Sequence, residues 1–321
     1  MKANQGFPKP WCCQIELVEG CNRICPFCGL NGIRDKVGNY KYVDWETINR
    51  TINGISELMP TGRLEFAMHG EPTMHPEYLG ILRAFRKALP KVQMQITTNG
   101  KVIRPKMQER MEAIFDVGVD FVILDTYHPE RDEMREAASK LKGIEVKDYY
   151  VDCVPQGWSP WANHHRKVRR RVVLMDDLLN RDGETRARTI YNHAGNTKFK
   201  GDQPELPLQS KCTMPFREIA VTWNGNVNIC CMDWGHELVC GNVNDMPLLS
   251  IWEGPIFQAI RKVLYQKSRE FSPCVGCDYK AKRIGLLPKM PLPTEADKQV
   301  LRQAVDTPTA TNGHKPYHNI K

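Results

Sequence analysis

The sequence lacks the long apolar run that a membrane-spanning helix needs, which is about eighteen residues. Residues 1–10 also lack the apolar core of a secretory signal peptide. Aromatic residues make up only 8% of the chain, whereas 41% of residues are hydrophobic and 26% are charged. These proportions are typical of ordinary globular proteins rather than of disordered or fibrous chains. The sequence therefore predicts a cytoplasmic protein without a membrane anchor, with room for one large domain or for a large and a small one.

The chain also lacks a recognisable nucleic-acid-binding module, although its formal net charge is +8. Its densest basic run is residues 164–171, which no aromatic residues interrupt. This run is compatible with a solvated loop face, with a substrate phosphate and with nucleic acid. Because phosphate binding needs a shaped site as well as charge, we favour the solvated face and expect no nucleic-acid partner.

Cysteine, in contrast, is plentiful: the chain has 12 cysteines, which in a cytosolic protein indicate metal binding or catalysis rather than disulfides. Cys21, Cys25 and Cys28 have the spacing C-x3-C-x2-C. Three thiolates on one loop can bind three irons of a cubane cluster and leave the fourth iron open for another ligand. A zinc knuckle and three unrelated buried thiols remain as alternatives at this point.

Strand and helix patterns alternate after this loop. Strands are expected at 64–68, 92–96, 121–124 and 144–151, and helices at 45–58 (capped by Asp44), 78–88, 107–115 and 131–141. Such alternation predicts an α/β fold with a parallel sheet, whose chemistry lies at the carboxyl ends of the strands. Polar motifs follow three of these strands: His69-Gly70-Glu71-Pro72, Thr97-Thr98-Asn99-Gly100 and Asp125-Thr126. Each motif by itself is also compatible with an ordinary turn.

The cysteine loop and these motifs, taken in order, resemble the radical S-adenosylmethionine (radical SAM) superfamily. Here His69 stands where the family's Gly-Gly-Glu-Pro motif has its first glycine. The resemblance implies a partial (β/α)6 barrel, a [4Fe–4S] cluster on the three cysteines and bound S-adenosylmethionine. It also implies a set of cofactor-binding residues: Phe27, Gly70, Glu71, Pro72, Thr98, Asn99, Asp125 and Thr126.

A second cysteine set lies further along the chain: Cys212, Cys230, Cys274 and Cys277. Strands at 218–223 and 226–230, joined by Asn224-Gly225 in a type I′ turn, bring Cys230 towards Cys212. A helix is expected over 248–265. Four such thiolates fit either a cubane cluster or a four-cysteine zinc site.

This set resembles the SPASM extension of radical SAM enzymes in its shortened twitch form, because no cysteine follows Cys277. The overall spacing is similar to that of 2-deoxy-scyllo-inosamine dehydrogenase-type enzymes, which oxidise an aminocyclitol alcohol. The resemblance implies one auxiliary [4Fe–4S] cluster in a small α+β domain. We therefore expect a barrel over 1–207 (with 155–207 as insertion or linker), a twitch domain over 208–287 and a tail over 288–321 that wraps the surface or is disordered.

The remaining cysteines have less specific interpretations. Cys12 and Cys13 are expected to be buried, and Cys153 lies beyond a strand that points at the barrel mouth. Cys231 and Cys240 are candidates to replace Cys230 as a ligand or to donate a hydrogen atom to a substrate radical, with simple packing as the alternative. His193 is a candidate acid/base or substrate contact, and an ordinary loop histidine is the alternative.

The resemblance implies that a 5′-deoxyadenosyl radical abstracts hydrogen from a small polar metabolite (a sugar, aminocyclitol or nucleoside derivative), giving oxidation or epimerisation. The basic balance allows an anionic substrate, and a donor such as flavodoxin or ferredoxin is expected to supply the electron. The alternative is maturation of a ribosomally made peptide, although about twenty residues before the first motif cysteine are too few for a leader-binding domain. A zinc-stabilised nucleic-acid-binding protein is the third hypothesis, and it leaves the ordered motifs unexplained.

Overall fold

The computed structural model describes residues 9–25, 27–32, 38–127, 129–148, 170–175, 191–197, 204–280 and 289–306. Cys153, most of the predicted 155–207 insertion, residues 164–169 of the basic run and the end of the tail lie outside these residues. No helix in the described part of the chain has both the length and the hydropathy that crossing a bilayer requires.

The fold is built on one nine-stranded sheet, with strand order β11-β10-β9-β1-β4-β5-β6-β8-β7. Six parallel strands form its larger part: β1 (Cys12–Ile15), β4 (Gly62–Phe66), β5 (Val92–Thr98), β6 (Phe121–Asp125), β8 (Arg171–Met175) and β7 (Glu145–Asp148). A separate two-stranded sheet joins β2 (Val18–Glu19) to β3 (Lys41–Tyr42). The predicted α/β class with a parallel sheet is therefore confirmed. The last two strands do not follow chain order, because β8 pairs with β6 and β7 lies at the edge of the sheet.

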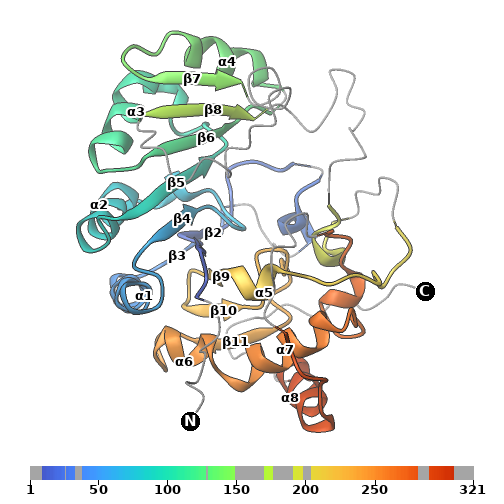
Figure 1. The fold of residues 1–321 in the computed structure, drawn as a ribbon. Coiled ribbons are helices and arrows are strands. Elements are labelled where there is room, and N and C mark those ends of the chain that lie inside the picture. The colour runs from blue at the N-terminus through green and yellow to red at the C-terminus, as the bar shows by residue number, and fades with distance from the viewer. Residues whose placement is uncertain are drawn as a thin grey trace.

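Four helices cover one side of this sheet (Figure 1). They are α1 (Trp45–Leu58), α2 (Tyr78–Ala88), α3 (Met107–Asp116) and α4 (Arg131–Ser139). The predicted N-cap of α1 is confirmed, since Asp44 accepts a hydrogen bond from the backbone N–H of Thr47 at 2.7 Å. Ile48, Ile52 and Ile55 repeat at helical spacing and are buried against the sheet, which fixes the inner face of α1.

The C-terminal part of the chain continues the same sheet. Strand β9 (Glu218–Val221) pairs parallel with β1, and β10 (Asn226–Asn228) and β11 (Val239–Asn242) follow in antiparallel order. Residues about 200 positions apart in sequence are thus direct neighbours, for example Cys13 and Ile219. The boundary expected at residue 207 stays a prediction, and one continuous sheet runs across it.

The β9–β10 hairpin forms where the sequence predicts it, but its turn is not type I′. Only Gly225 has a positive φ, of 84°, and Asn224 does not. The Gly225 N–H donates to the carbonyl oxygen of Thr222, and the Thr222 N–H donates to that of Asn226. This is a three-residue loop with glycine in the left-handed position, so Trp223 lies in the turn rather than in a strand.

One helix prediction in this part was wrong. The expected helix over 248–265 is two helices, α6 (Leu248–Trp252) and α7 (Pro255–Tyr265), because Pro255 cannot continue a preceding helix and begins a new one. The tail contains α8 (Glu295–Asp306), which packs on α7 through buried Leu301 and a 2.7 Å ion pair between Lys262 and Asp297. The short helix α5 (Met214–Arg217) leads into β9.

Candidate active site

The three cysteines of the first motif line a cavity of about 260 Å³ at the carboxyl ends of the parallel strands. The loops after β4, β5 and β6 supply the facing wall. The lining residues are Cys21, Arg23, Cys25, Phe27, Cys28, Leu30, Ala67, Met68, His69, Gly70, Glu71, Thr97, Thr98, Asn99, Asp125, Tyr127, His193 and Trp234. Six of the eight predicted cofactor contacts are among them.

The other two predicted contacts, Pro72 and Thr126, do not line this cavity. Pro72 is buried and begins the 3-10 turn η2 (Pro72–Met74). The hydroxyl of Thr126 donates to the carbonyl oxygen of Met175, at 2.8 Å, and so holds the end of β6 to β8. Both residues therefore support the loops of the site from behind.

Glu71 connects two walls of the cavity. Its carboxylate accepts hydrogen bonds from the hydroxyl of Thr98 at 2.7 Å and from the backbone N–H of Asn99 at 2.8 Å. It also accepts from the backbone N–H and the hydroxyl of Thr73. Burial raises the pKa of Glu71, while these donors favour its ionised form. The side chain predicted to contact the cofactor thus fixes the loop after β4 to the loop after β5.

Gly70 has a steric reason to be glycine. A Cβ atom there would lie 1.7 Å from the carbonyl oxygen of Val18, so the motif loop could not approach the β2 segment with any larger residue. The neighbouring Glu71 N–H donates to the carbonyl oxygen of Gly20 at 2.9 Å. Preceding it, Met68 has a positive φ of 68°, a strained conformation of the kind that collects at functional sites.

Polar contacts at the cysteine loop suit an iron–sulfur cluster. The Asn99 side chain donates to the sulfur of Cys21 at 3.2 Å and to the side-chain oxygen of Asn22 at 2.9 Å. Burial raises the pKa of Cys25 to about 11, with a further increase from Cys28 and an opposing effect of Arg23. Because metal ligation requires thiolates, these thiols need the charge of bound iron to ionise, and the three-thiol set fits such a group.

The four cysteines of the second set come together in the C-terminal part. Burial raises the pKa of the Cys230 thiol, and the thiols of Cys231, Cys212, Cys274 and Cys277 raise it further. The last two lie on the 3-10 turn η6 (Cys274–Gly276) and directly after it. The thiol of Cys230 thus lies near the other three thiols of the set, and four such thiols are the donor set of a fully ligated cubane cluster or of zinc.

Cys231 and Cys240 point elsewhere. The thiol of Cys231 lies near the carboxyl groups of Glu218 and Glu65, and its pKa is raised by burial and by those groups. Burial raises the pKa of Cys240, which lies near Asp233 and Arg261. Neither lines the cavity. The pKa of Cys230, in contrast, is also raised by the thiols of Cys212, Cys274 and Cys277, which lie near it. The expected burial of Cys12 and Cys13 is confirmed.

One residue beside the second cysteine set, Arg269, was not predicted from the sequence. Arg269 is almost fully buried, and its positive charge lowers the pKa of Cys212, Cys274 and Cys277 against the effect of burial. It is held by the carbonyl oxygens of Ser210 and Tyr279. A buried cation beside four thiols would offset the negative charge of a cluster there.

A stack of aromatic rings connects the cavity to the auxiliary site. The ring centre of His193 lies 4.4 Å from that of Trp234 in a stacked arrangement, and the ring centre of His69 lies 4.5 Å from that of Trp234 in a tilted one. The Nε2 atom of His69 lies 2.9 Å from the carbonyl oxygen of Cys231. Both histidines and the tryptophan line the cavity, and Cys231 adjoins Cys230 in sequence. The two cysteine sites are therefore neighbours through side chains of the C-terminal part.

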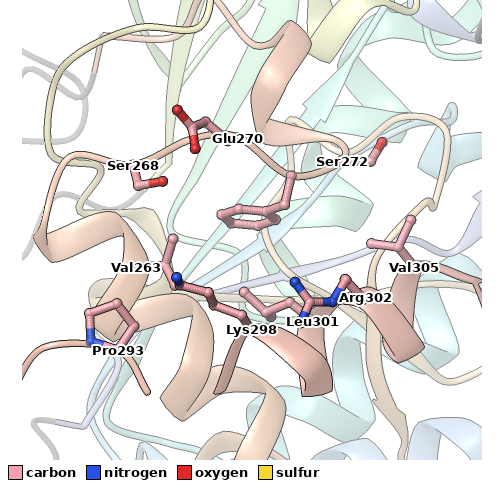
Figure 2. A pocket seen from close by; sticks show the side chains of 10 residues that line it. Val263, Ser268, Glu270, Ser272, Pro293, Lys298, Leu301, Arg302 and Val305 are labelled. Carbon is pink, nitrogen blue, oxygen red and sulfur yellow. The ribbon is translucent and has the colours of Figure 1, made fainter. Parts of the chain in front are cut away.

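A larger cavity, of about 640 Å³, lies between α7 and α8, and no cysteine lines it (Figure 2). Lys298, Leu301 and Arg302 of α8 face Ser268 and Glu270 across it. It contains no residue of the predicted motifs, so we assign the chemistry to the smaller cavity.

Comparison with known families supports this assignment. Residues 15–151 match the radical SAM superfamily model, and residues 212–278 match the SPASM model, an iron–sulfur cluster-binding domain. The chain is 23% identical over 274 residues to the S-adenosyl-L-methionine-dependent 2-deoxy-scyllo-inosamine dehydrogenase of Niallia circulans, covering 83% of this chain and 91% of that protein. It is 24% identical over 108 residues to a cofactor-modifying protein of Pyrococcus furiosus for the tungsten-containing aldehyde ferredoxin oxidoreductase.

Solved structures with the same fold include BtrN in complex with AdoMet and 2-DOIA. That match has a TM-score of 0.63 at 20% identity and covers 84% of this chain and 93% of BtrN. Streptococcus suis SuiB bound to precursor peptide SuiA matches with a TM-score of 0.53 at 15% identity, covering 84% of this chain and 70% of SuiB. At these identities the likeness concerns the fold.

Proposed function

This chain belongs to the radical SAM superfamily and has a C-terminal SPASM domain, and from that premise we propose that it is a dehydrogenase of a small polar alcohol of the aminocyclitol or sugar class. One observation carries the proposal: the similarity to 2-deoxy-scyllo-inosamine dehydrogenase extends over 83% of this chain and 91% of that enzyme. The two matched domain models, over 15–151 and 212–278, contain the two cysteine sets, and the proposed reaction uses both.

The residues present fit the cofactors that the two domains imply, a [4Fe–4S] cluster with S-adenosylmethionine and an auxiliary iron–sulfur cluster. When bound, these groups supply a 5′-deoxyadenosyl radical and an electron acceptor. Cys21, Cys25 and Cys28 would hold the first cluster, with Asn99 donating to the sulfur of Cys21. The ring of Trp234 lines one side of the cavity.

Oxidation of an alcohol removes a hydrogen atom from the carbinol carbon, a proton from the hydroxyl group and one further electron. We assign the proton to Nδ1 of His193, which is buried without a hydrogen-bond partner among the described residues and belongs to the cavity wall. Burial lowers the pKa of His193 to about 4, so the ring is neutral at pH 7 and is able to accept a proton. The electron would leave towards the four-thiol site, which the ring stack adjoins.

Oxidation is favoured over epimerisation by the position of the thiols. An epimerase needs a spare thiol that returns a hydrogen atom to the substrate radical. Among the described residues, the cysteines that line the cavity are the three of the cluster motif, and Cys231 and Cys240 lie outside it. A one-electron donor such as flavodoxin or ferredoxin would be needed to start each cycle.

The substrate class is tested with 2-deoxy-scyllo-inosamine deuterated at the carbinol carbon. We expect one deuterium to appear in 5′-deoxyadenosine and one ketone to form for each S-adenosylmethionine consumed, both measured by mass spectrometry. A panel of sugars and other aminocyclitols, with deuterium at each carbinol position, defines the range of substrates. If no small alcohol in the panel transfers deuterium to 5′-deoxyadenosine, the proposal is wrong.

Peptide modification is the second candidate, because the fold is shared with SuiB, whose structure contains a precursor peptide. The same assay distinguishes the two candidates when peptides replace the alcohols. Deuterium transfer from a peptide, with the alcohols left unchanged, would favour this alternative.

His193→Gln is expected to reduce ketone formation by about 100-fold or more, which is the usual contribution of a general base. Formation of 5′-deoxyadenosine in the absence of substrate should persist, because His193 does not belong to the cysteine loop. Both products are quantified in one chromatographic run. An equal loss of both products would instead indicate that the variant damages the cluster site.

A further inference from the structure

Three buried side chains converge at the wall of the cavity, where one of them, His69, lines it. They are Glu16, which follows β1, His69, which follows β4, and His236 from the loop after β10. Their exposed fractions are 0%, 1% and 9%. Nδ1 of His69 lies 3.0 Å from Nε2 of His236 and 3.9 Å from Oε1 of Glu16, and all three atoms lie within 4.8 Å of one another. Two imidazoles and one carboxylate thus meet at a single point.

The ring of His69 is held so that its nitrogen lone pair faces this point. A carbonyl oxygen can only accept, so the 2.9 Å contact with the carbonyl oxygen of Cys231 requires the hydrogen on Nε2 of His69. Nδ1 of the neutral ring therefore carries the lone pair. Donation of the outer N–H to a backbone carbonyl is the usual way in which a metal-binding histidine is oriented.

One carboxylate oxygen of Glu16 lacks a hydrogen-bond partner at this point among the described residues. Its Oε2 atom accepts from the backbone N–H of Trp223 at 3.2 Å. Its Oε1 atom, directed at the two histidines, is fully buried and has no hydrogen-bond partner among the described residues. A hydrogen bond between the two rings satisfies the histidines but leaves this oxygen unpaired, which is unfavourable for a buried carboxylate. A cation would give all three atoms a partner.

We propose that Glu16, His69 and His236 bind a zinc ion, at a site separate from both iron–sulfur sites. Bonds of about 2.0–2.2 Å in tetrahedral geometry place ligand atoms about 3.3–3.5 Å apart. The distances of 3.0 Å and 3.9 Å lie on either side of that range, so small side-chain movements would bring the three ligands to the ion, and its fourth position would be left for water. Two imidazole ligands favour zinc over magnesium or calcium, which prefer oxygen ligands.

Such an ion would join the ends of β1 and β4 to the auxiliary-domain loop that carries Trp234. His236 has a positive φ of 52°, a strained backbone that a metal bond would help to retain. His69 is also the residue that replaces the first glycine of the cofactor motif, so a metal ligand gives that replacement a reason. The expected role is structural: the ion would fix the wall of the cavity formed by Trp234.

The test is the zinc content of the full chain after anaerobic reconstitution with iron and sulfide, so that iron fills the cysteine sites. After incubation with zinc and desalting, wild type is expected to retain about one zinc per chain. Glu16→Gln and His236→Asn should each retain less than about a tenth of that amount, with unchanged iron. The matched control is His75→Asn, since His75 is also buried but its ring nitrogens contact the carbonyl oxygen of Val43 and the N–H of Glu77.

A second measurement guards against a variant that folds poorly. Zinc should raise the melting temperature of the wild type and of the control, because a ligand that binds only the folded state stabilises it. It should not raise that of Glu16→Gln, which keeps the shape of the side chain. Wild type without retained zinc, or zinc that persists in both variants, overturns the proposal. So does zinc that appears only as iron is lost, since it would then occupy the cysteine sites.

Discussion

Replacing Cys21, Cys25 and Cys28 with alanine is expected to abolish reductive cleavage of S-adenosylmethionine and to lower the iron content from about eight to about four per chain. The reason is that these three thiols line the cavity in which the motif loops after β4, β5 and β6 also meet. Without them the cluster has no protein ligands, and its open iron position is lost with it. The remaining iron belongs to the four-thiol site, whose ligands lie on other segments.

The measurement is iron and sulfide content together with 5′-deoxyadenosine formation under a strong reductant. Cys13→Ala is the matched control, because Cys13 is fully buried in β1 and contacts neither thiol set. It should keep all the iron. A fall from about four irons to none in the triple variant would show that the second set does not hold a cubane cluster.

The double variant Cys274→Ala/Cys277→Ala is expected to separate radical formation from oxidation. It removes two of the four thiols that raise one another's pKa in the auxiliary site, so the iron content should again fall from about eight to about four. Cleavage of S-adenosylmethionine should continue, since the first cysteine loop is intact. Ketone formation should fall by about 100-fold or more, equivalent to about 2.7 kcal/mol, because the substrate electron has no acceptor.

Cys231→Ala is the control for this variant. The thiol of Cys231 lies beside Glu218 and Glu65. The variant should therefore keep about eight irons and should form as much ketone per cleaved S-adenosylmethionine as the wild type. Ketone formation that persists in the double variant would show that the oxidation does not need the auxiliary cluster. Loss of iron in Cys231→Ala would show that the neighbouring Cys230 is not the ligand.

Local sequence was sufficient for much of the fold. The apolar spacing and the Asp44 cap predicted α1 with the bounds that the structure has, because a helix is determined by neighbours three and four residues apart. The tail helix α8 was missed, since its stability depends on packing against α7. The β8–β7 order was missed too, because strand pairing between distant segments has no local signal.

What the sequence by itself determined is the chemistry of the two cysteine sets and the position of the cofactor loops. Three thiols within eight residues share one loop in any fold, and polar motifs after consecutive parallel strands meet at one edge of the sheet. Only the tertiary structure decided that the thiol of Cys230 lies near those of Cys212, Cys274 and Cys277, and that His69 turns towards His236 and Glu16. These choices depend on β9 pairing with β1 across about 200 residues, which brings the auxiliary loop against the barrel, and no local spacing encodes such a contact.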